Sequence, residues 1–259
     1  MESNFGGAIQ ACGGSCTHGC FHGVMMEMFQ TDSDTLGGVL NDGSPQDILA
    51  GIERIAPDLC SMPEVENVVL PRYCTHGLGH SLAYFSGNDL EASIRSCSVL
   101  TKRHAVNSCV SGVFMETLFS TTSTALLLTS GTEPCDRFPG NEVPCYRYKA
   151  YGWIYVHGGV QPALTACDRF GDFTLLCIRS VAMAAARDET VETRDGIEDL
   201  CGRLAGDKRA ECVIGALLKI IDSNNGHDSD SLCHPVDPMY RDICLSMLQK
   251  FRNSIASNE

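Results

Sequence analysis

Paired cysteines constrain the fold of this chain more than any other feature of its sequence. The cysteines of a pair stand 10 to 14 residues apart, and successive second cysteines follow one another after 32 to 36 residues. A period of about 34 residues is typical of two-helix repeats such as the tetratricopeptide repeat. The six predicted pairs are Cys60 with Cys74, Cys97 with Cys109, Cys135 with Cys145, Cys167 with Cys177, Cys201 with Cys212, and Cys233 with Cys244.

Turn and helix signals around the pairs agree with a two-helix unit. Residues 87–92 and 158–164 each combine a turn signal with a helix start, and they lead to Cys97 and Cys167. After a second cysteine the chain is apolar over helical lengths, as in residues 109–119. The predicted fold is therefore all-α: an αα-hairpin solenoid resembling tetratricopeptide repeats, in which disulfides within each repeat join the end of one helix to the start of the next.

Disulfides are the favoured use of these cysteines, and metal thiolate sites are the alternative. Structural zinc sites separate two cysteines by two to four intervening residues, and the observed pairs lack that arrangement. A disulfide that closes a loop of this length stabilises the fold by roughly 3 kcal/mol in the chain-entropy model. Cys12, Cys16 and Cys20 remain outside the pairs. Because the total of 15 cysteines is odd, at least one thiol has no partner within the chain.

The repeat pattern predicts one helical-repeat domain over residues 1–259. Residues 1–36 contain two motifs, C-T-H-G from Cys16 and G-V-x-M-E from Gly23, whose registers disagree by four residues when matched to later copies. We therefore expect a partial first repeat there. Residues 37–259 would form about six helix pairs, each linked by a disulfide.

Half of the 8 histidines lie in two copies of the motif C-T-H-G-x-x-H, at residues 16–22 and 74–80. If each stretch is helical, its two histidines differ by about 40° around the helix axis and point the same way. Such a pair can hold a transition-metal ion, and second helices of successive repeats pack closely enough for two pairs to share one ion. The alternative is that they are buried and bonded to the backbone, or exposed without a role. The predicted metal ligands are His18, His22, His76 and His80.

Copper is the narrowly favoured metal. Residues 12–28 combine thiol, imidazole and thioether groups, and this mixture favours copper, especially Cu(I). If the thiols are oxidised, the four imidazoles alone suit Cu(II), zinc(II) or iron(II). Met25 and Met26 are expected on the same helical stripe as the first histidine pair, and simple core filling is the alternative role for them.

Two glutamates occupy equivalent places in the G-V-x-M-E motif, Glu27 and Glu116. They suggest a dinuclear carboxylate site like that of ferritin-type bundles. On a regular helix, however, Glu27 lies about 180° from His18 and about 140° from His22, so it cannot join their pair. We therefore expect each glutamate to be a structural partner for a lysine, an arginine or a backbone amide.

Charge and hydropathy exclude several kinds of function. The net charge of −13 disfavours binding to nucleic acid. No apolar run approaches the roughly 20 residues of a transmembrane helix, and the first residues do not resemble a signal peptide. Because disulfides persist in oxidising compartments, we expect a secreted, periplasmic or organelle-lumen protein whose signal or anchor is absent from this chain.

Two of the motifs resemble those of a known group of proteins. The string C-T-H-G-L-G-H from Cys74 and the string G-V-F-M-E from Gly112 are similar to C-x-H-G-x-G-H and C-x-x-G-V-F-M-E in a family of exported bacterial and archaeal cysteine-rich helical repeats. The match covers residues 12–120, and beyond these only the cysteine rhythm agrees. The resemblance implies the fold and export, and it implies no chemistry.

The sequence leaves two functional hypotheses. The first is an exported protein that binds a transition metal through the histidine pairs. The second is an interaction scaffold whose concave surface binds another protein, with the histidines only packing. An enzyme with an open metal coordination position is a weaker third possibility, because no catalytic motif is present and no catalytic residue is predicted.

An aromatic patch is expected either in the core or as a ligand-binding face, and it consists of Tyr146, Tyr148, Tyr151, Trp153 and Tyr155.

Overall fold

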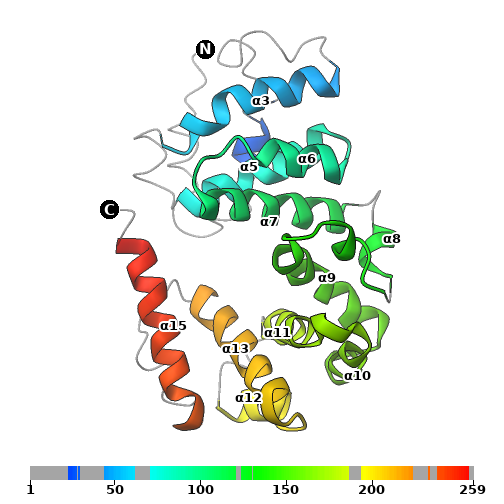
Figure 1. Ribbon diagram of the computed structural model, residues 1–259, viewed down its shortest axis with the longest axis vertical. Coiled ribbons are helices and arrows are strands. Elements are labelled where there is room, and N and C mark those ends of the chain that lie inside the picture. Colours follow the sequence, from blue (N-terminus) through cyan, green and yellow to red (C-terminus); the bar gives the residue numbers. More distant parts are fainter. Residues whose placement is uncertain are drawn as a thin grey trace. The chain divides into compact units, whose positions relative to one another are not determined.

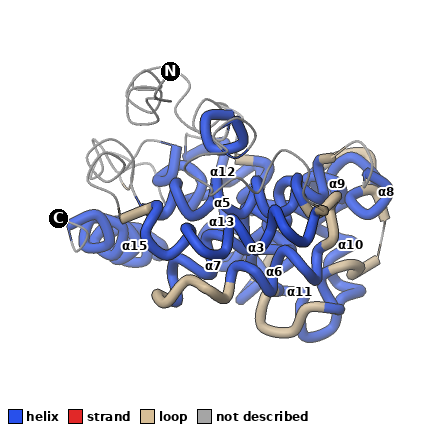
Figure 2. Tube along the Cα trace, turned by 90° about the horizontal axis from the view of Figure 1, so that it is seen from above, coloured by secondary structure: helices blue, strands red, loops and turns tan. Residues whose placement is uncertain are grey.

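The computed structural model describes residues 23–27, 29, 44–61, 71–120, 124–129, 131–186, 194–223, 233 and 238–256. These residues form helices, turns and loops, with no strand among them (Figure 2). The predicted all-α class is confirmed. The helices labelled in Figure 1 are α3 (Pro45–Leu59), α5 (Pro71–Phe85), α6 (Leu90–Cys97), α7 (Arg103–Phe119), α8 (Thr124–Leu127), α9 (Glu142–Val156), α10 (Val160–Ala166), α11 (Thr174–Ala185), α12 (Arg194–Cys201), α13 (Gly206–Ser223) and α15 (Pro238–Ala256), and the 3-10 helices are η1 (Cys135–Arg137) and η2 (Cys167–Phe173).

The helices belong to two compact units, Met1–Thr124 and Ala125–Glu259. In the first unit, α5 packs against α7, and the helices α3 and α6 pack against this pair. In the second unit, α11 packs between α9 and α13, and α15 packs on α13. Each unit is therefore built on long helices that contact one another, and further helices pack against them. A single solenoid domain over the whole chain stays a prediction.

Local sequence signals account for several helix starts. Ser44 caps α3 in a reciprocal capping box with Asp47, and Pro45 occupies the first helical position. Asp89 caps α6 by accepting a hydrogen bond of 3.0 Å from the amide of Ala92. Gly87 precedes this cap with a φ of +70°, a conformation that suits glycine. The turn and helix start predicted at residues 87–92 are therefore confirmed.

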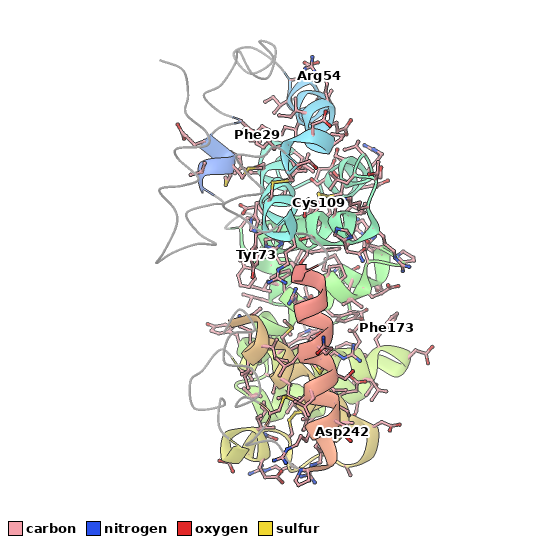
Figure 3. The ribbon with its side chains drawn as sticks, turned by 90° about the vertical axis from the view of Figure 1, so that its left-hand side faces the viewer. Phe29, Arg54, Tyr73, Cys109, Phe173 and Asp242 are labelled. Atoms are coloured by element: carbon pink, nitrogen blue, oxygen red, sulfur yellow. A yellow bond between two sulfur atoms is a disulfide. The ribbon has the colours of Figure 1, made fainter. Side chains whose placement is uncertain are left out.

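All six predicted disulfides are present, and their half-cystines are buried. The second cysteine of each pair lies within a long helix, and the first lies in the segment that precedes it. Cys97 at the end of α6, for example, is bonded to Cys109 within α7 (Figure 3). The disulfides thus attach each long helix to the preceding segment. The confirmed bonds join Cys60 to Cys74, Cys97 to Cys109, Cys135 to Cys145, Cys167 to Cys177, Cys201 to Cys212, and Cys233 to Cys244.

The position of the second cysteine within its long helix differs from one pair to the next. Cys145 lies in the first turn of α9, and Cys177 lies in the first turn of α11. Cys244 lies in the second turn of α15. The predicted connection from the end of one helix to the start of the next is therefore correct for the second cysteine of these pairs. Of their partners, Cys135 begins the 3-10 helix η1, whereas Cys167 is the C-cap of α10 and also begins η2.

Two glycines allow α5 and α7 to approach backbone to backbone. A Cβ atom at Gly79 would collide with the carbonyl oxygen of Cys109, and one at Gly112 would collide with the carbonyl oxygen of His76. Leu78 of α5 and Val113 of α7 are fully buried beside these glycines. The resulting close contact sets which side chains of α7 face the histidines of α5.

The contact made by Gly112 recurs in the second unit, whereas the position equivalent to Gly79 is Ala182. A Cβ atom at Gly215 of α13 would collide with the carbonyl oxygen of Arg179 in α11. Gly215 and Gly112 each follow the second cysteine of their helix by three residues, and Arg179 and His76 each follow theirs by two. A repeated helix pair would produce this equivalence of register.

The predicted aromatic patch is divided between the core and the surface. Trp153 and Tyr146 of α9 are fully buried, whereas Tyr155 is 78% exposed. Trp153 stacks on Phe170, with the ring centroids 4.7 Å apart. The phenol of Tyr146 has its pKa raised to about 12, chiefly by burial. Core packing is therefore the role of the buried rings.

Lys149 of α9 is fully buried, which the sequence does not predict. Its ammonium donates hydrogen bonds to the carbonyl oxygen of Leu126, in α8, and to the hydroxyl of Thr129. Burial lowers the pKa of this ammonium to about 8, while the charge of Glu133 acts in the opposite direction. Lys149 thus attaches the end of α8 to α9.

None of the described helices is both long and apolar enough to cross a membrane.

Candidate metal centre

The histidines of the second C-T-H-G-x-x-H motif lie on α5, with His80 buried and His76 partly buried. Their Nε2 atoms are 3.3 Å apart, and their rings are nearly perpendicular, with an interplanar angle of 76°. The two imidazoles therefore converge on one point, as helical spacing of four residues predicts. Cys74, two positions before His76, is bonded to Cys60 and occupies a different face of the helix.

The Nδ1 atoms of both rings contact oxygen atoms of α7. His80 Nδ1 lies 2.8 Å from Oε2 of Glu116, and His76 Nδ1 lies 3.3 Å from the backbone carbonyl oxygen of Ser108. A carbonyl oxygen and a carboxylate oxygen only accept hydrogen bonds, so each ring donates from Nδ1. The outer side of the histidine pair is thus held by the neighbouring helix.

These contacts fix the tautomer of both rings. When Nδ1 of a neutral imidazole carries the proton, Nε2 carries a lone pair. The Nε2 atoms that carry these lone pairs, one from His76 and one from His80, are 3.3 Å apart. Two such lone pairs repel unless a cation lies between them or one ring carries a second proton.

Ser108 is held against α5 by two contacts. Its hydroxyl donates to the carbonyl oxygen of Arg72, and its own carbonyl oxygen accepts from His76. The hydroxyl of Thr75 donates to the same Arg72 carbonyl at 3.2 Å. These hydrogen bonds fix the first turn of α5 relative to α7, which in turn orients the ring of His76.

The role of Glu116 differs from the one expected from the sequence. We expected a lysine, an arginine or a backbone amide as its partner, but its carboxylate accepts from His80. Angles on a single helix say nothing about a carboxylate on the next one, and Glu116 reaches the histidines from α7. Its counterpart Glu27 is exposed. The repeated G-V-x-M-E motif was the sequence signal for this residue.

The remaining predicted site residues are only partly described. His18 and His22, with Cys12, Cys16 and Cys20, lie outside the described residues. Met25 is fully buried, as core filling requires. Among the described residues, no three or more His, Cys, Asp or Glu side chains are arranged to hold a metal ion. The described residues therefore supply a two-nitrogen clip.

The second unit carries a variant of this arrangement built on an ion pair. Arg179 of α11, equivalent to His76 in register, contacts Oε2 of Glu211 through Nε at 2.5 Å. Glu211 precedes Cys212 as Ser108 precedes Cys109. An ion pair therefore joins the two long helices where the first unit uses a histidine.

The other two positions of the site are also replaced. Met183 is equivalent to His80, since each follows the second cysteine of its helix by six residues. Lys219 is equivalent to Glu116, since each follows by seven. Packing of such a helix pair evidently requires neither an imidazole nor the carboxylate that orients it.

Comparison of the chain with protein-family models, curated proteins and solved structures finds no match in any of the three. The resemblance to exported cysteine-rich repeats therefore stays a prediction. Function is inferred from the side chains and their contacts, because a fold alone does not specify chemistry.

Proposed function

We propose that this protein binds a transition-metal ion through Nε2 of His76 and Nε2 of His80. The observation that carries the proposal is the convergence of these two atoms at 3.3 Å while both Nδ1 atoms donate to α7. The sequence adds His18 and His22 as the further ligands, from the other copy of the motif.

The contacts of the Nδ1 atoms support the proposal. Histidines that bind metals almost always donate their other ring nitrogen to a carboxylate or a backbone carbonyl, which orients the ring and raises its basicity. His80 has the carboxylate partner and His76 has the carbonyl partner.

The second unit gives independent support. Its equivalent helix pair places Arg179, Met183, Glu211 and Lys219 where the first unit has His76, His80, Ser108 and Glu116. The glycine contact between the helices is retained although these four residues differ. The histidines are therefore a feature added to the helix pair.

We further propose that the protein works in an oxidising compartment outside the cytosol. The support is the set of buried disulfides, which recurs from Cys60 in α3's C-cap to Cys244 in α15. Such frameworks persist where thiols are not kept reduced. Storage or delivery of the metal fits this compartment.

Metal analysis of the chain with intact disulfides tests the proposal. We expect about one transition-metal ion per chain after purification without chelators, and loss of that ion in the His76→Ala/His80→Ala double variant. His104→Ala is the matched control, since this histidine is exposed in the first turn of α7. The absence of metal, even after metal is supplied to the purified chain, would count against the proposal.

A protein-binding scaffold is the second candidate function. Tyr84 and Phe119 are 46% and 45% exposed, and each follows the second cysteine of its helix by ten residues. Exposed aromatic side chains at equivalent positions of packed helices are suited to contact a partner. If this is the function, His76→Ala lowers stability without changing a metal content of zero.

A further inference from the structure

We infer that His76 and His80 bind a divalent ion with tetrahedral coordination, such as zinc(II), in place of the copper favoured by the sequence. This inference rests on the proposed function and names the class of ion that the site selects. Three features of the site carry it: the distance between the nitrogens, the chemical type of the ligands and the charge of Glu116.

The distance between the two Nε2 atoms matches a tetrahedral centre. Nitrogens that each lie about 2.0–2.1 Å from an ion at the tetrahedral angle are roughly 3.3–3.4 Å apart. At the right angle of a square-planar or octahedral centre, the same bonds place them roughly 2.8–3.0 Å apart. The distance between His76 Nε2 and His80 Nε2 is 3.3 Å. A linear two-coordinate ion would require about 4 Å with the same bond lengths.

Contacts with α7 hold the clip in this arrangement. Each ring is held at Nδ1 by an atom of α7, and the backbones of α5 and α7 are in contact at Gly79 and Gly112. A change in the distance between the Nε2 atoms would therefore disturb hydrogen bonds or helix packing. The site thus favours ions that accept a tetrahedral angle without rearrangement.

Among the described residues the ligands are imidazoles, and the nearest cysteines cannot act as thiolate ligands because they form disulfides. Cys74 and Cys109 are the cysteines of α5 and α7, and both are consumed in disulfides with Cys60 and Cys97. Thiolate and thioether ligands select Cu(I), whereas imidazole suits zinc, copper and iron alike. Among the described residues the site therefore offers imidazole alone, which gives no preference for Cu(I), and the tetrahedral angle disfavours tetragonal Cu(II).

The carboxylate of Glu116 adds a negative charge next to the ligands. It accepts from Nδ1 of His80 at 2.8 Å, and its side chain is 25% exposed. A carboxylate in this position makes the imidazole a stronger ligand and partly offsets the charge of the bound ion. The arrangement of carboxylate, histidine and ion is common at zinc sites and suits a dication better than a monocation.

Cobalt(II) is the spectroscopic probe that tests this inference. Tetrahedral cobalt(II) absorbs strongly in the visible range, and six-coordinate cobalt(II) absorbs weakly. Titration of the disulfide-intact chain with cobalt(II) chloride should give the strong bands, saturating near one equivalent, and zinc(II) should abolish them. Affinity ranking against copper is not informative, because Cu(II) binds most nitrogen sites more tightly than zinc whatever their geometry.

Two variants assign the signal to this site. His76→Ala/His80→Ala should lose the strong bands entirely, and Arg179→Ala, at the equivalent position of the second unit, should retain them. Weak six-coordinate bands that depend on the histidines would overturn the tetrahedral assignment and leave metal binding intact. Failure to bind cobalt(II), zinc(II) or copper at all would overturn the proposed function as well.

Discussion

His80 of α5 and Glu116 of α7 form a hydrogen bond of 2.8 Å between residues that are 36 positions apart in the chain. The bond connects the long helices of two successive disulfide-linked hairpins. It also leaves Nε2 of His80 directed at Nε2 of His76. This contact between two packed helices therefore sets which ring nitrogen of His80 carries the proton.

Substitution of Glu116 by glutamine should weaken metal binding without abolishing it. The amide retains an oxygen that can accept from His80, but it lacks the charge that strengthens the imidazole as a ligand. Loss of such an outer partner typically reduces metal affinity by about 10–100-fold. Competition with a chelator of known affinity measures the change.

Glu211→Gln is the matched control for that variant. Glu211 pairs with Arg179 in the second unit, at the position equivalent to Ser108. Metal affinity should stay at the wild-type value in this control. Equal affinity in the Glu116→Gln protein would show that the carboxylate does not act on the site.

Gly112→Ala should destabilise the fold and weaken metal binding together. In a helix, replacing glycine by alanine normally stabilises by roughly 0.5–1 kcal/mol. Here the new Cβ atom would collide with the carbonyl oxygen of His76, so α5 and α7 must move apart. We expect a net loss of about 1–3 kcal/mol in urea unfolding.

Two further glycines separate the causes of that effect. Gly215→Ala should cost similar stability, because its Cβ would collide with the Arg179 carbonyl, yet it should leave metal affinity unchanged. Gly131 in the second unit has no described atom near its Cβ position, so Gly131→Ala should change neither the stability nor the metal affinity. If Gly112→Ala binds metal as wild type does, the close approach of α5 and α7 is irrelevant to the site.

The disulfides and helix pairs could be predicted because their signals are local. Cys97 and Cys109 are 12 residues apart, and the turn and helix start between Gly87 and Ala92 are visible in the residue types. The convergence of His76 and His80 follows from helical periodicity alone. These features require no knowledge of how one hairpin packs on the next.

The outer partners of the histidines could not be predicted in the same way. Which residue of α7 faces His80 depends on the contact of Gly79 and Gly112 with the opposite backbone. The partner of His76 is a backbone oxygen, for which the side chain of Ser108 gives no signal. Lys149 is a similar case, since lysine is almost never fully buried and its partners lie on another segment.

The buried Lys149 should give the fold a stability that rises at alkaline pH. Its pKa is about 8 in the folded chain, lowered from 10.5 by burial. Between these values the unfolded chain binds more protons than the folded one, so the free energy of unfolding increases with pH. Below pH 8 both states are protonated, and this group contributes no slope.

Comparison with Lys149→Met isolates that contribution. The difference in unfolding free energy between the wild type and the variant should grow in favour of the wild type between pH 8 and pH 10.5. Urea unfolding after alkylation of free thiols measures it, because alkaline conditions promote disulfide exchange. Parallel stability curves across this window would contradict the burial of the ammonium.

Removal of the disulfide between Cys97 and Cys109 should cost stability and metal affinity, because Cys109 lies at the point where α7 contacts Gly79 of α5. Replacing both cysteines by alanine should lower the free energy of unfolding by about 3 kcal/mol, as expected for a loop of this size. The double replacement of Cys201 and Cys212 is the matched control, since it opens a similar loop in the second unit and should leave metal affinity unchanged. Retained affinity in the first variant would mean that α5 alone positions the two imidazoles, and loss in both would indicate a general effect of reduced stability.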